Sequence, residues 1–395
     1  SFFSREIVFS RTSSDSSDKT VLSTASSGLS GNTTLSAASS DSLSLYASSA
    51  ALIDASSGRL LYGKDPYNEL PMASTTKIMT CILALEYGDP DEVVTVSAYA
   101  ASMPDVQLNA REGEQYYLGD LLYAMMLESY NDVAVAVAEH IGGSVEGFAE
   151  LMNAKAERMG LSHTHFVTPN GLDADGHYTT AYDLAILGAY AIANEDFLAI
   201  TNTSAWSFST VDGTRSFTVS NKDAFLTQMD GAIGIKTGFT SKAGYCFVGA
   251  LRDGNRTFVS VVLASGWPPN KTYKWSDTRK LMEYGLANYS YRCIFTPIDH
   301  FATLAVTDGL ADSVDTWIDG TLNLLMREDE TVNVIYDYDE TLAAPVTAGE
   351  IVGYAYVTLD QSLVATYPIR AAESVARKNY LYYLNYVMKS FTASF

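Results

Sequence analysis

The sequence reads Pro71-Met-Ala-Ser-Thr-Thr-Lys-Ile-Met-Thr80 at the head of a strongly apolar helical pattern that continues to about Tyr87. Proline suits the first turn of a helix, so we expect the helix to open at Pro71. Ser74 and Lys77 are three positions apart and would share one helix face, one turn apart. A serine hydroxyl is a weak nucleophile until a base takes its proton, and a desolvated lysine can be that base. The spacing alone occurs by chance in many proteins.

Two tripeptides accompany this pair. Ser129-Tyr-Asn131 lies between two predicted helices, and Lys236-Thr-Gly238 lies on a predicted strand that spans residues 232–240. Ser129 lies 55 residues after Ser74, and Lys236 lies a further 107 residues along the chain. Each motif is common, but the ordered set S-x-x-K, S-x-N and K-T-G is typical of serine penicillin-recognising enzymes.

The surrounding sequence resembles the serine-type D-alanyl-D-alanine carboxypeptidases over residues 45–288. These are low-molecular-weight penicillin-binding proteins of the DD-peptidase and serine β-lactamase-like superfamily. The segments that carry the resemblance, besides the first motif, are Asn131-Asp-Val-Ala, Ala138-Glu-His-Ile, Thr164-His-Phe-Val-Thr-Pro-Asn-Gly-Leu-Asp173, His177-Tyr-Thr-Thr-Ala-Tyr-Asp183 and Gly234-Ile-Lys-Thr-Gly-Phe-Thr-Ser-Lys-Ala-Gly-Tyr-Cys246. Position 130 departs from the pattern, since it is tyrosine where the family more often has glycine.

The resemblance implies three catalytic residues. Ser74 attacks the carbonyl carbon of the D-Ala-D-Ala bond and becomes acylated. Lys77 takes the hydroxyl proton, and its ammonium form is disfavoured by desolvation and by the second cation of Lys236. Ser129 relays a proton to the leaving D-Ala amine.

The remaining motif residues are expected to bind substrate. Asn131 hydrogen-bonds the substrate amide or holds Lys77, while Lys236 and Thr237 bind the free terminal carboxylate. Gly238 lets the substrate backbone approach the strand closely. By resemblance, the backbone N–H groups of Ser74 and Phe239 form an oxyanion hole.

The function expected from this set is that of a serine D,D-carboxypeptidase, which removes the terminal D-Ala from peptidoglycan pentapeptide stems through an acyl-enzyme and is inhibited covalently by β-lactams. One alternative is a serine β-lactamase. A class A enzyme needs a deacylating Glu in an E-x-x-L-N segment some 35 residues after S-x-N, and the segment 170–177 offers none. A second alternative is a non-catalytic penicillin-binding sensor or wall-binding module, which has no need of a poised nucleophile.

Asn170, Gly171 and His177 lie in a loop that resembles the rim of the family's site, and we expect them to act mainly as turn residues.

The order of predicted elements indicates an α+β domain with a mainly antiparallel sheet flanked by helices and a helical subdomain, followed by a small all-β domain. We divide the chain into a Ser-rich leader or linker (1–44), a catalytic domain (45–289), a C-terminal β domain (290–377) and an amphipathic tail (378–395). Helices are expected at about 71–87, 118–127, 132–141, 145–159, 180–194 and 277–288, and strand signals fall at about 49–54, 57–62, 201–220, 232–240, 245–252, 256–264, 331–338 and 351–358.

Composition excludes some partners. The net charge of −21 argues against nucleic acid, which needs a basic surface. Three dispersed cysteines form no disulfide framework, and we expect no metal or cofactor. The start at Ser1, without a signal-peptide pattern, is interpreted as a mature or trimmed form, which leaves export open. The expected location is extracytoplasmic, either secreted or attached to the outer face of the bacterial cytoplasmic membrane.

Apolar residues recur at helical spacing from Tyr380 to Phe391, which predicts an interfacial helix, or a helix that docks on its own domain.

Overall fold

The computed structural model describes residues 43–104 and 106–392, so most of the predicted leader (1–44) and the last three residues of the predicted tail lie outside the described residues. The chain forms two compact units. The first runs to Leu251 and resumes over Val259–Leu281, and the second combines Arg252–Phe258 with the chain from Met282 onward.

A five-stranded sheet organises the first unit, in the order β2-β1-β9-β8-β7. The pairs β1/β2 and β7/β8 are antiparallel. β7 lies at an edge of the sheet, so one side of it is open to other groups. The strands are β1 (Ser49–Asp54), β2 (Leu60–Lys64), β7 (Ala232–Thr240), β8 (Gly244–Asp253) and β9 (Arg256–Leu263).

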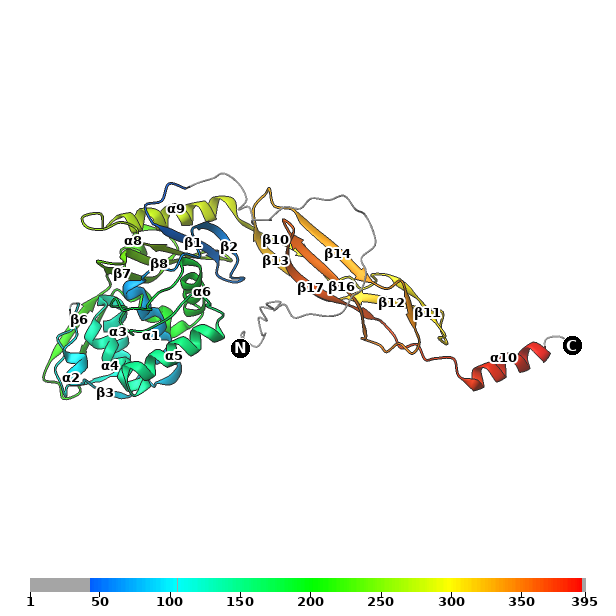
Figure 1. The fold of residues 1–395 in the computed structure, drawn as a ribbon, viewed down its shortest axis with the longest axis horizontal. Helices are drawn as coiled ribbons and strands as arrows, with labels where there is room; N and C mark the ends of the chain where they lie inside the picture. The colour runs from blue at the N-terminus through cyan, green and yellow to red at the C-terminus, as the bar shows by residue number, and fades with distance from the viewer. Residues whose placement is uncertain (1–42, 105, 393–395) are drawn as a thin grey trace. The chain divides into compact units, whose positions relative to one another are not determined.

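Helices cover both faces of this sheet (Figure 1). Neighbouring residues of a strand point to opposite faces. On β8, Phe247 packs against Trp275 of α9 (Tyr273–Asn288), with ring centroids 4.7 Å apart. The next residue, Val248, lies against Gly188 of α6 (Ala181–Ala191), where an added Cβ would come 3.1 Å from the valine. Alternation along one strand therefore places α9 and α6 on opposite faces.

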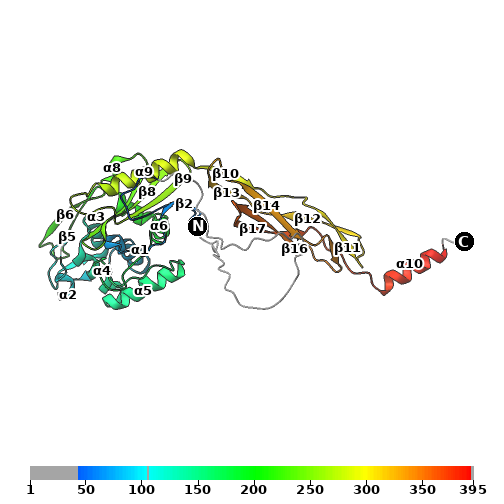
Figure 2. The same cartoon turned by 45° about the horizontal axis from the view of Figure 1, so that its top comes forward.

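The remaining helices build an apolar subdomain beside the sheet (Figure 2). Their inward faces form one buried core, in which Tyr116 and Phe148 are fully buried. Several helices begin with a capping side chain; Ser144, for example, accepts a hydrogen bond from Gly147 N at 3.0 Å. The elements are η1 (Ala73–Thr76), α1 (Lys77–Tyr87), β3 (Val93–Thr95), α2 (Ala98–Ala101), β4 (Gln115–Tyr117), α3 (Leu118–Glu128), α4 (Asn131–Gly142), α5 (Val145–Arg158), α7 (Glu195–Asn202), β5 (Ala205–Ser209), β6 (Ser216–Ser220) and α8 (Phe225–Gln228).

Several predicted elements differ from the structure. The strand expected over 57–62 runs from Leu60 to Lys64 as β2, and the helix expected over 277–288 already begins at Tyr273 as α9. The helix expected from Pro71 begins as the 3₁₀ turn η1 and becomes α-helical only at Lys77, because Ala73 has a left-handed φ of +50° that a regular helix does not admit. The strand signal expected from Thr201 is wrong at its start. Thr201 belongs to α7, and the strands that follow form the β5–β6 hairpin.

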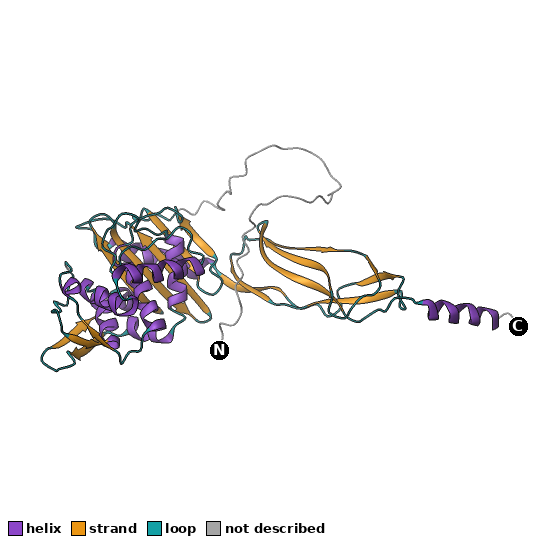
Figure 3. Ribbon diagram, turned by 60° about the horizontal axis from the view of Figure 1, so that its bottom comes forward, coloured by secondary structure: helices purple, strands orange, loops and turns teal. Residues whose placement is uncertain are grey.

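The second unit is dominated by strands (Figure 3), as the sequence predicted. Its six-stranded sheet has the order β14-β16-β17-β12-β11-β15, and β10 pairs with β13 in a separate ribbon. Alternate residues of β16, such as Ala355 and Val357, are fully buried in its core. The strands are β10 (Ser290–Phe295), β11 (Thr303–Thr307), β12 (Ser313–Ile318), β13 (Leu322–Met326), β14 (Val332–Tyr338), β15 (Thr341–Ala343), β16 (Ile351–Leu359) and β17 (Ser362–Ala371).

The predicted tail helix is present as α10 (Tyr380–Thr392). Its large apolar and aromatic side chains are exposed, for example Tyr380 at 77% and Leu381 at 64%. Among the described residues, no single helix is long and apolar enough to cross a membrane, and the pair α6 and α7 meets that test only jointly, across a bend of 103°.

Candidate active site

The structure brings the three sequence motifs together where η1 and α1, the α3–α4 junction and the edge strand β7 meet. The Nζ atom of Lys77 lies 2.9 Å from Ser74 Oγ and 2.9 Å from Asn131 Oδ1. Gly238 of β7 lies against the same turn, since a Cβ added there would come 3.0 Å from Ser74 N. Residues from three separate parts of the sequence thus surround the Ser74 hydroxyl.

Lys77 is fully buried, and its amine has three oxygen neighbours. Besides Ser74 Oγ and Asn131 Oδ1, the main-chain carbonyl of Asn170 lies 2.6 Å from Nζ. Burial, followed by the nearby charge of Lys236, holds the pKa of Lys77 well below its usual range, against the opposing effect of Asp132.

A neutral amine has two N–H groups and one lone pair. Asn131 Oδ1 and the carbonyl of Asn170 can only accept hydrogen bonds, so they take the two N–H groups. In that neutral form the lone pair of Lys77 Nζ would be left for the Ser74 hydroxyl, whose Oγ lies 2.9 Å away and could then donate to it. This arrangement is the one that general-base activation of a serine requires.

Two glycines flank the peptide bond between Ala73 and Ser74. Gly238 lies on one side of it, where an added Cβ would come 3.1 Å from Ala73 Cβ and 3.0 Å from Ser74 N. Gly171, at φ +83°, lies on another side, and an added Cβ would overlap the carbonyl oxygen of Ala73. The left-handed Ala73 is therefore enclosed by backbone that leaves no room for side chains.

The second motif contributes two differently placed side chains. Asn131 opens α4; its amide donates from Nδ2 to Pro104 O at 3.1 Å, which fixes Oδ1 toward Lys77. Ser129 ends α3 in the left-handed region, with φ +71°. Its Oγ atom is buried and has no hydrogen-bond partner among the described residues. A buried hydroxyl without a partner is costly, so Ser129 Oγ retains its capacity to hydrogen-bond a group that enters the site.

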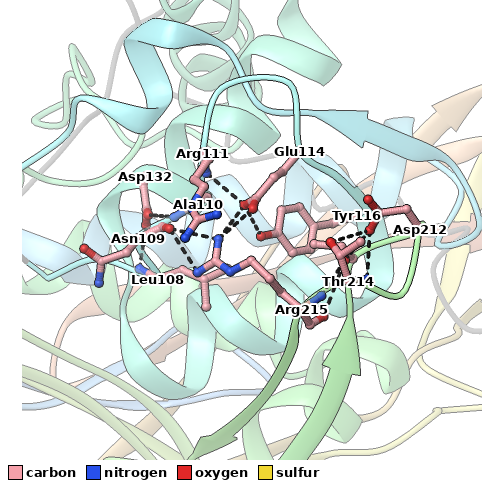
Figure 4. Close-up of polar contacts among 11 residues, drawn as sticks. Leu108, Asn109, Ala110, Arg111, Glu114, Tyr116, Asp132, Asp212, Thr214 and Arg215 are labelled. Atoms are coloured by element: carbon pink, nitrogen blue, oxygen red, sulfur yellow. Dashed lines mark hydrogen bonds and ion pairs between the residues drawn. The ribbon is translucent and has the colours of Figure 1, made fainter.

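The loop that orients Asn131 is itself fastened by Asp132 and Arg215, two residues for which the sequence indicated no role in the site (Figure 4). Asp132, fully buried in α4, accepts hydrogen bonds from Leu108 N at 3.0 Å and Ala110 N at 3.1 Å. Arg215, between β5 and β6, donates to Asn109 O at 3.2 Å and also pairs with Glu114 at 2.7 Å. The first-turn position of Asp132 was the only available signal, and it also fits an ordinary helix N-terminus.

The third motif lies on the edge strand β7. Lys236 is buried, and burial, followed by the charge of Lys274, lowers its pKa to about 7, while Asp223 and Glu128 act in the opposite direction. Its Nζ donates to Thr237 O at 3.2 Å. Thr237 is half-buried, and Phe239 is 40% exposed and packs on Tyr245 with centroids 4.6 Å apart.

Asp223, whose charge acts on Lys236, is a further residue near the site that the sequence did not indicate. Burial raises the pKa of this carboxyl to about 6, against its hydrogen bond from Phe225 N and the charges of Lys236 and Lys274. Its Oδ2 atom has no hydrogen-bond partner among the described residues. Lys274 reaches the region from α9 and lies 5.4 Å from the Tyr245 ring centroid.

The loop that carries Asn170, Gly171 and His177 contacts the site directly, beyond the turn role expected for it. Asn170 supplies the carbonyl that accepts from Lys77, and Gly171 packs on Ala73. His177 is buried and its Nε2 lies 2.9 Å from Thr76 Oγ1. Within the described ranges, no group of three or more His, Cys, Asp or Glu side chains could hold a metal ion.

Comparison with known proteins places this geometry in context. A family model described as D-alanyl-D-alanine carboxypeptidase matches residues 34–266, more than half of the chain. A second model, described as the C-terminal domain of penicillin-binding protein 5, matches residues 299–377.

Individual relatives agree with the family models. The chain is 28% identical over 354 residues to D-alanyl-D-alanine carboxypeptidase DacF of Bacillus subtilis, covering 88% of this chain and 90% of that protein. It is 34% identical over 249 residues to D-alanyl-D-alanine carboxypeptidase DacB2 of Mycobacterium tuberculosis, covering 61% of this chain and 82% of that one. The solved structure of penicillin-binding protein 5 from Haemophilus influenzae aligns with a TM-score of 0.70 at 27% identity, covering 86% of this chain and 100% of the other.

Proposed function

Because the chain belongs to the D-alanyl-D-alanine carboxypeptidase family and is a serine-type peptidase of that family, we propose that Ser74 is its nucleophile and Lys77 the base that activates it. The observation that carries this assignment is the buried Lys77 amine, whose Nζ lies 2.9 Å from Ser74 Oγ and within hydrogen-bond distance of two carbonyl oxygens, so that the neutral amine would have its lone pair left for Ser74. The family acts on peptidoglycan stems that end in D-Ala-D-Ala and binds β-lactams.

Acylation follows from this geometry. Ser74 Oγ attacks the carbonyl carbon of the terminal D-Ala-D-Ala bond as its proton passes to Lys77 Nζ. The negative charge that forms on the carbonyl oxygen is stabilised by the backbone N–H groups of Ser74 and Phe239, each of which is typically worth about 3 kcal/mol. Collapse of the intermediate breaks the C–N bond, and the proton that Lys77 took up passes to the leaving D-Ala amine, which returns Lys77 to its neutral form. Water then hydrolyses the ester on Ser74.

Ser129 and Asn131 assist on one side of the site. Ser129 Oγ is buried and without a partner among the described residues, so it is available to pass a proton to the leaving amine. Asn131 holds Lys77 through Oδ1.

Lys236, Thr237 and Gly238 recognise the end of the chain. Lys236 supplies a positive charge, and Thr237 a hydroxyl, for the free carboxylate of the terminal D-Ala. Because the pKa of Lys236 is lowered to about 7, a bound carboxylate would favour its charged form. Gly238 keeps the strand edge open next to Ser74 N.

The two alternatives fit less well. The loop 170–177 presents no glutamate that could activate a deacylating water, as a class A β-lactamase requires. A non-catalytic binder would not need a lysine buried at the cost of its charge beside a serine hydroxyl. The family match likewise favours the carboxypeptidase.

The assignment is tested with a diacetyl-Lys-D-Ala-D-Ala peptide and a fluorescent penicillin. The wild type is expected to release D-Ala and to be labelled at Ser74, with the modified peptide identified by mass spectrometry. Ser74→Ala is expected to lose both, by a factor of about 10⁴ or more in D-Ala release, because no acyl-enzyme can form. Ser57→Ala, in an exposed turn of the same unit, serves as the matched control and should behave as wild type. Equal D-Ala release by wild type and Ser74→Ala would contradict the assignment.

We further propose that the enzyme works outside the cytoplasm and that α10 attaches it to the membrane surface. The substrate class of the family lies in the cell wall, which supports an extracytoplasmic location. Helix α10 exposes Leu384, Val387 and Met388 at 41%, 48% and 59%, together with several tyrosines. An amphipathic helix with such a face gains free energy by burying it at a lipid interface.

Removal of residues 378–395 is expected to lower association with vesicles that contain anionic lipid by about tenfold or more, because the apolar face of α10 is lost. Co-sedimentation with vesicles measures this effect. The double variant Leu384→Ser/Met388→Ser keeps the length and charge of the tail and should show most of the loss. Association that is unchanged by the deletion would refute the anchor.

A further inference from the structure

His177 is linked to the turn before the nucleophile by a continuous chain of hydrogen bonds. Its Nδ1 accepts from Val167 N at 3.0 Å, and its Nε2 lies 2.9 Å from Thr76 Oγ1, 101 residues away in sequence. Thr76 Oγ1 in turn donates to the carbonyl oxygen of Ala73 at 2.8 Å. All of these atoms belong to described residues, and both His177 and Thr76 are buried.

The partners fix the proton of the imidazole. A main-chain N–H can only donate, so Nδ1 is the acceptor of the Val167 bond. The Thr76 hydroxyl donates its hydrogen to Ala73 O, so Thr76 Oγ1 must accept from Nε2–H of His177. Burial, followed by the charge of His165, lowers the pKa of His177 to about 4, which keeps this neutral tautomer at physiological pH.

The chain ends on the peptide bond that carries the amide of Ser74. A trans peptide is planar, and its C=O and N–H point in opposite directions, so holding Ala73 O also orients Ser74 N–H. Gly171 and Gly238 pack on the same peptide but present only backbone. Thr76 Oγ1 is the side-chain group that the structure shows holding the carbonyl.

We propose that His177 is a positioning residue for acylation, which acts through Thr76 to hold the Ala73–Ser74 peptide so that Ser74 N–H points at the oxyanion. This inference rests on the proposed function, since it deepens the role given to Ser74. The group that it orients stabilises charge only in the transition state. Loss of the link should therefore slow acylation and leave the preceding non-covalent binding unchanged.

Two amide replacements of His177 test the hydrogen bonds of Nδ1 and of Nε2 one at a time. His177→Gln can place its amide nitrogen near the position of Nε2 and keep the donor to Thr76. His177→Asn can place its amide oxygen near Nδ1 and keep only the acceptor for Val167 N–H. Thr76→Val removes the relay, and Thr76→Ser keeps the hydroxyl. Acylation by a fluorescent penicillin is followed over a range of concentrations, which yields the acylation rate constant and the dissociation constant of the first complex separately. Thermal unfolding is measured for each variant.

His177→Asn and Thr76→Val are expected to lower the acylation rate constant by about 10- to 100-fold with the dissociation constant unchanged. His177→Gln and Thr76→Ser should stay within about threefold of the wild type. The double variant His177→Asn/Thr76→Val should be no slower than either single variant, because both break one chain.

A wild-type rate in His177→Asn would overturn the inference, as would a loss in His177→Gln equal to that in His177→Asn at matched thermal stability. A change confined to the dissociation constant would overturn it too. In all three cases the wild type is still labelled at Ser74, so the proposed function stands. A wild type that is not labelled at all would overturn the proposed function and the inference with it.

Discussion

Replacing Lys77 by methionine is expected to lower the acylation rate of Ser74 by about 10²- to 10⁴-fold, the usual contribution of a positioned general base. Methionine matches the apolar stem of lysine but has no lone pair for the proton of Ser74 Oγ, which lies 2.9 Å from Lys77 Nζ in the structure. The rate is measured with a fluorescent penicillin under single-turnover conditions and is confirmed by D-Ala release from the model peptide.

The chain offers a matched control in Lys155, a second lysine that is largely buried in the same unit. It pairs with Glu86 at 2.6 Å and with the hydroxyl of Tyr190 at 2.7 Å, away from the three motifs. Lys155→Met should lose stability but acylate at the wild-type rate.

Stability must be followed in parallel. Lys77→Met removes the hydrogen bonds that Lys77 donates to Asn131 Oδ1 and Asn170 O, each typically worth about 0.5–1.5 kcal/mol. A Lys77→Met variant that is folded and acylates as fast as the wild type would show that the base is another group.

Gly171→Ala is expected to be the most damaging change outside the three motifs. Its Cβ would overlap the carbonyl oxygen of Ala73 and lie 2.9 Å from Ser74 N, both of which are backbone atoms that cannot rotate away. The turn must shift, and a displacement of the nucleophile by about 1 Å can cost about 10²-fold in rate. The variant should be slow to acylate and less stable.

Gly176→Ala is the control for backbone strain alone. Gly176 has φ +80°, close to the +83° of Gly171, but the nearest atom to an added Cβ is His165 Nδ1 at 3.7 Å. Both variants carry the cost of a left-handed alanine, about 1–2 kcal/mol. Only Gly171→Ala adds overpacking, typically about 1–3 kcal/mol. Equal acylation rates and equal unfolding temperatures for the two variants would show that the contact with Ala73 is unimportant.

Much of the architecture follows from local patterns. The apolar periodicities predicted α3, α4, α5 and α10 close to their observed ends, and the alternation in β14 and β16 predicted the strand-rich second unit. These elements are set by side chains a few positions apart, which one sequence displays. Shorter or bent elements were missed or shifted, among them α2, α7, α8 and the 3₁₀ turn η1, because contacts from distant residues override local preference there.

The candidate active site likewise combines features that local sequence predicts with features that only the tertiary structure reveals. Ser74, Lys77, Ser129, Asn131 and Lys236 could be proposed as site residues because their chemistry lies in the side chain and their spacing can be read from the sequence. Asn170 could not be assigned its contact with Lys77, since it acts through a main-chain carbonyl that every residue possesses. Arg215 and Glu114 are 101 positions apart, and no local pattern connects them. The proposal of a nucleophile and its base could thus be made from the sequence alone, whereas the burial that lowers the pKa of Lys77 and the packing of Gly171 and Gly238 on the Ala73–Ser74 peptide depend on distant parts of the chain meeting at one place.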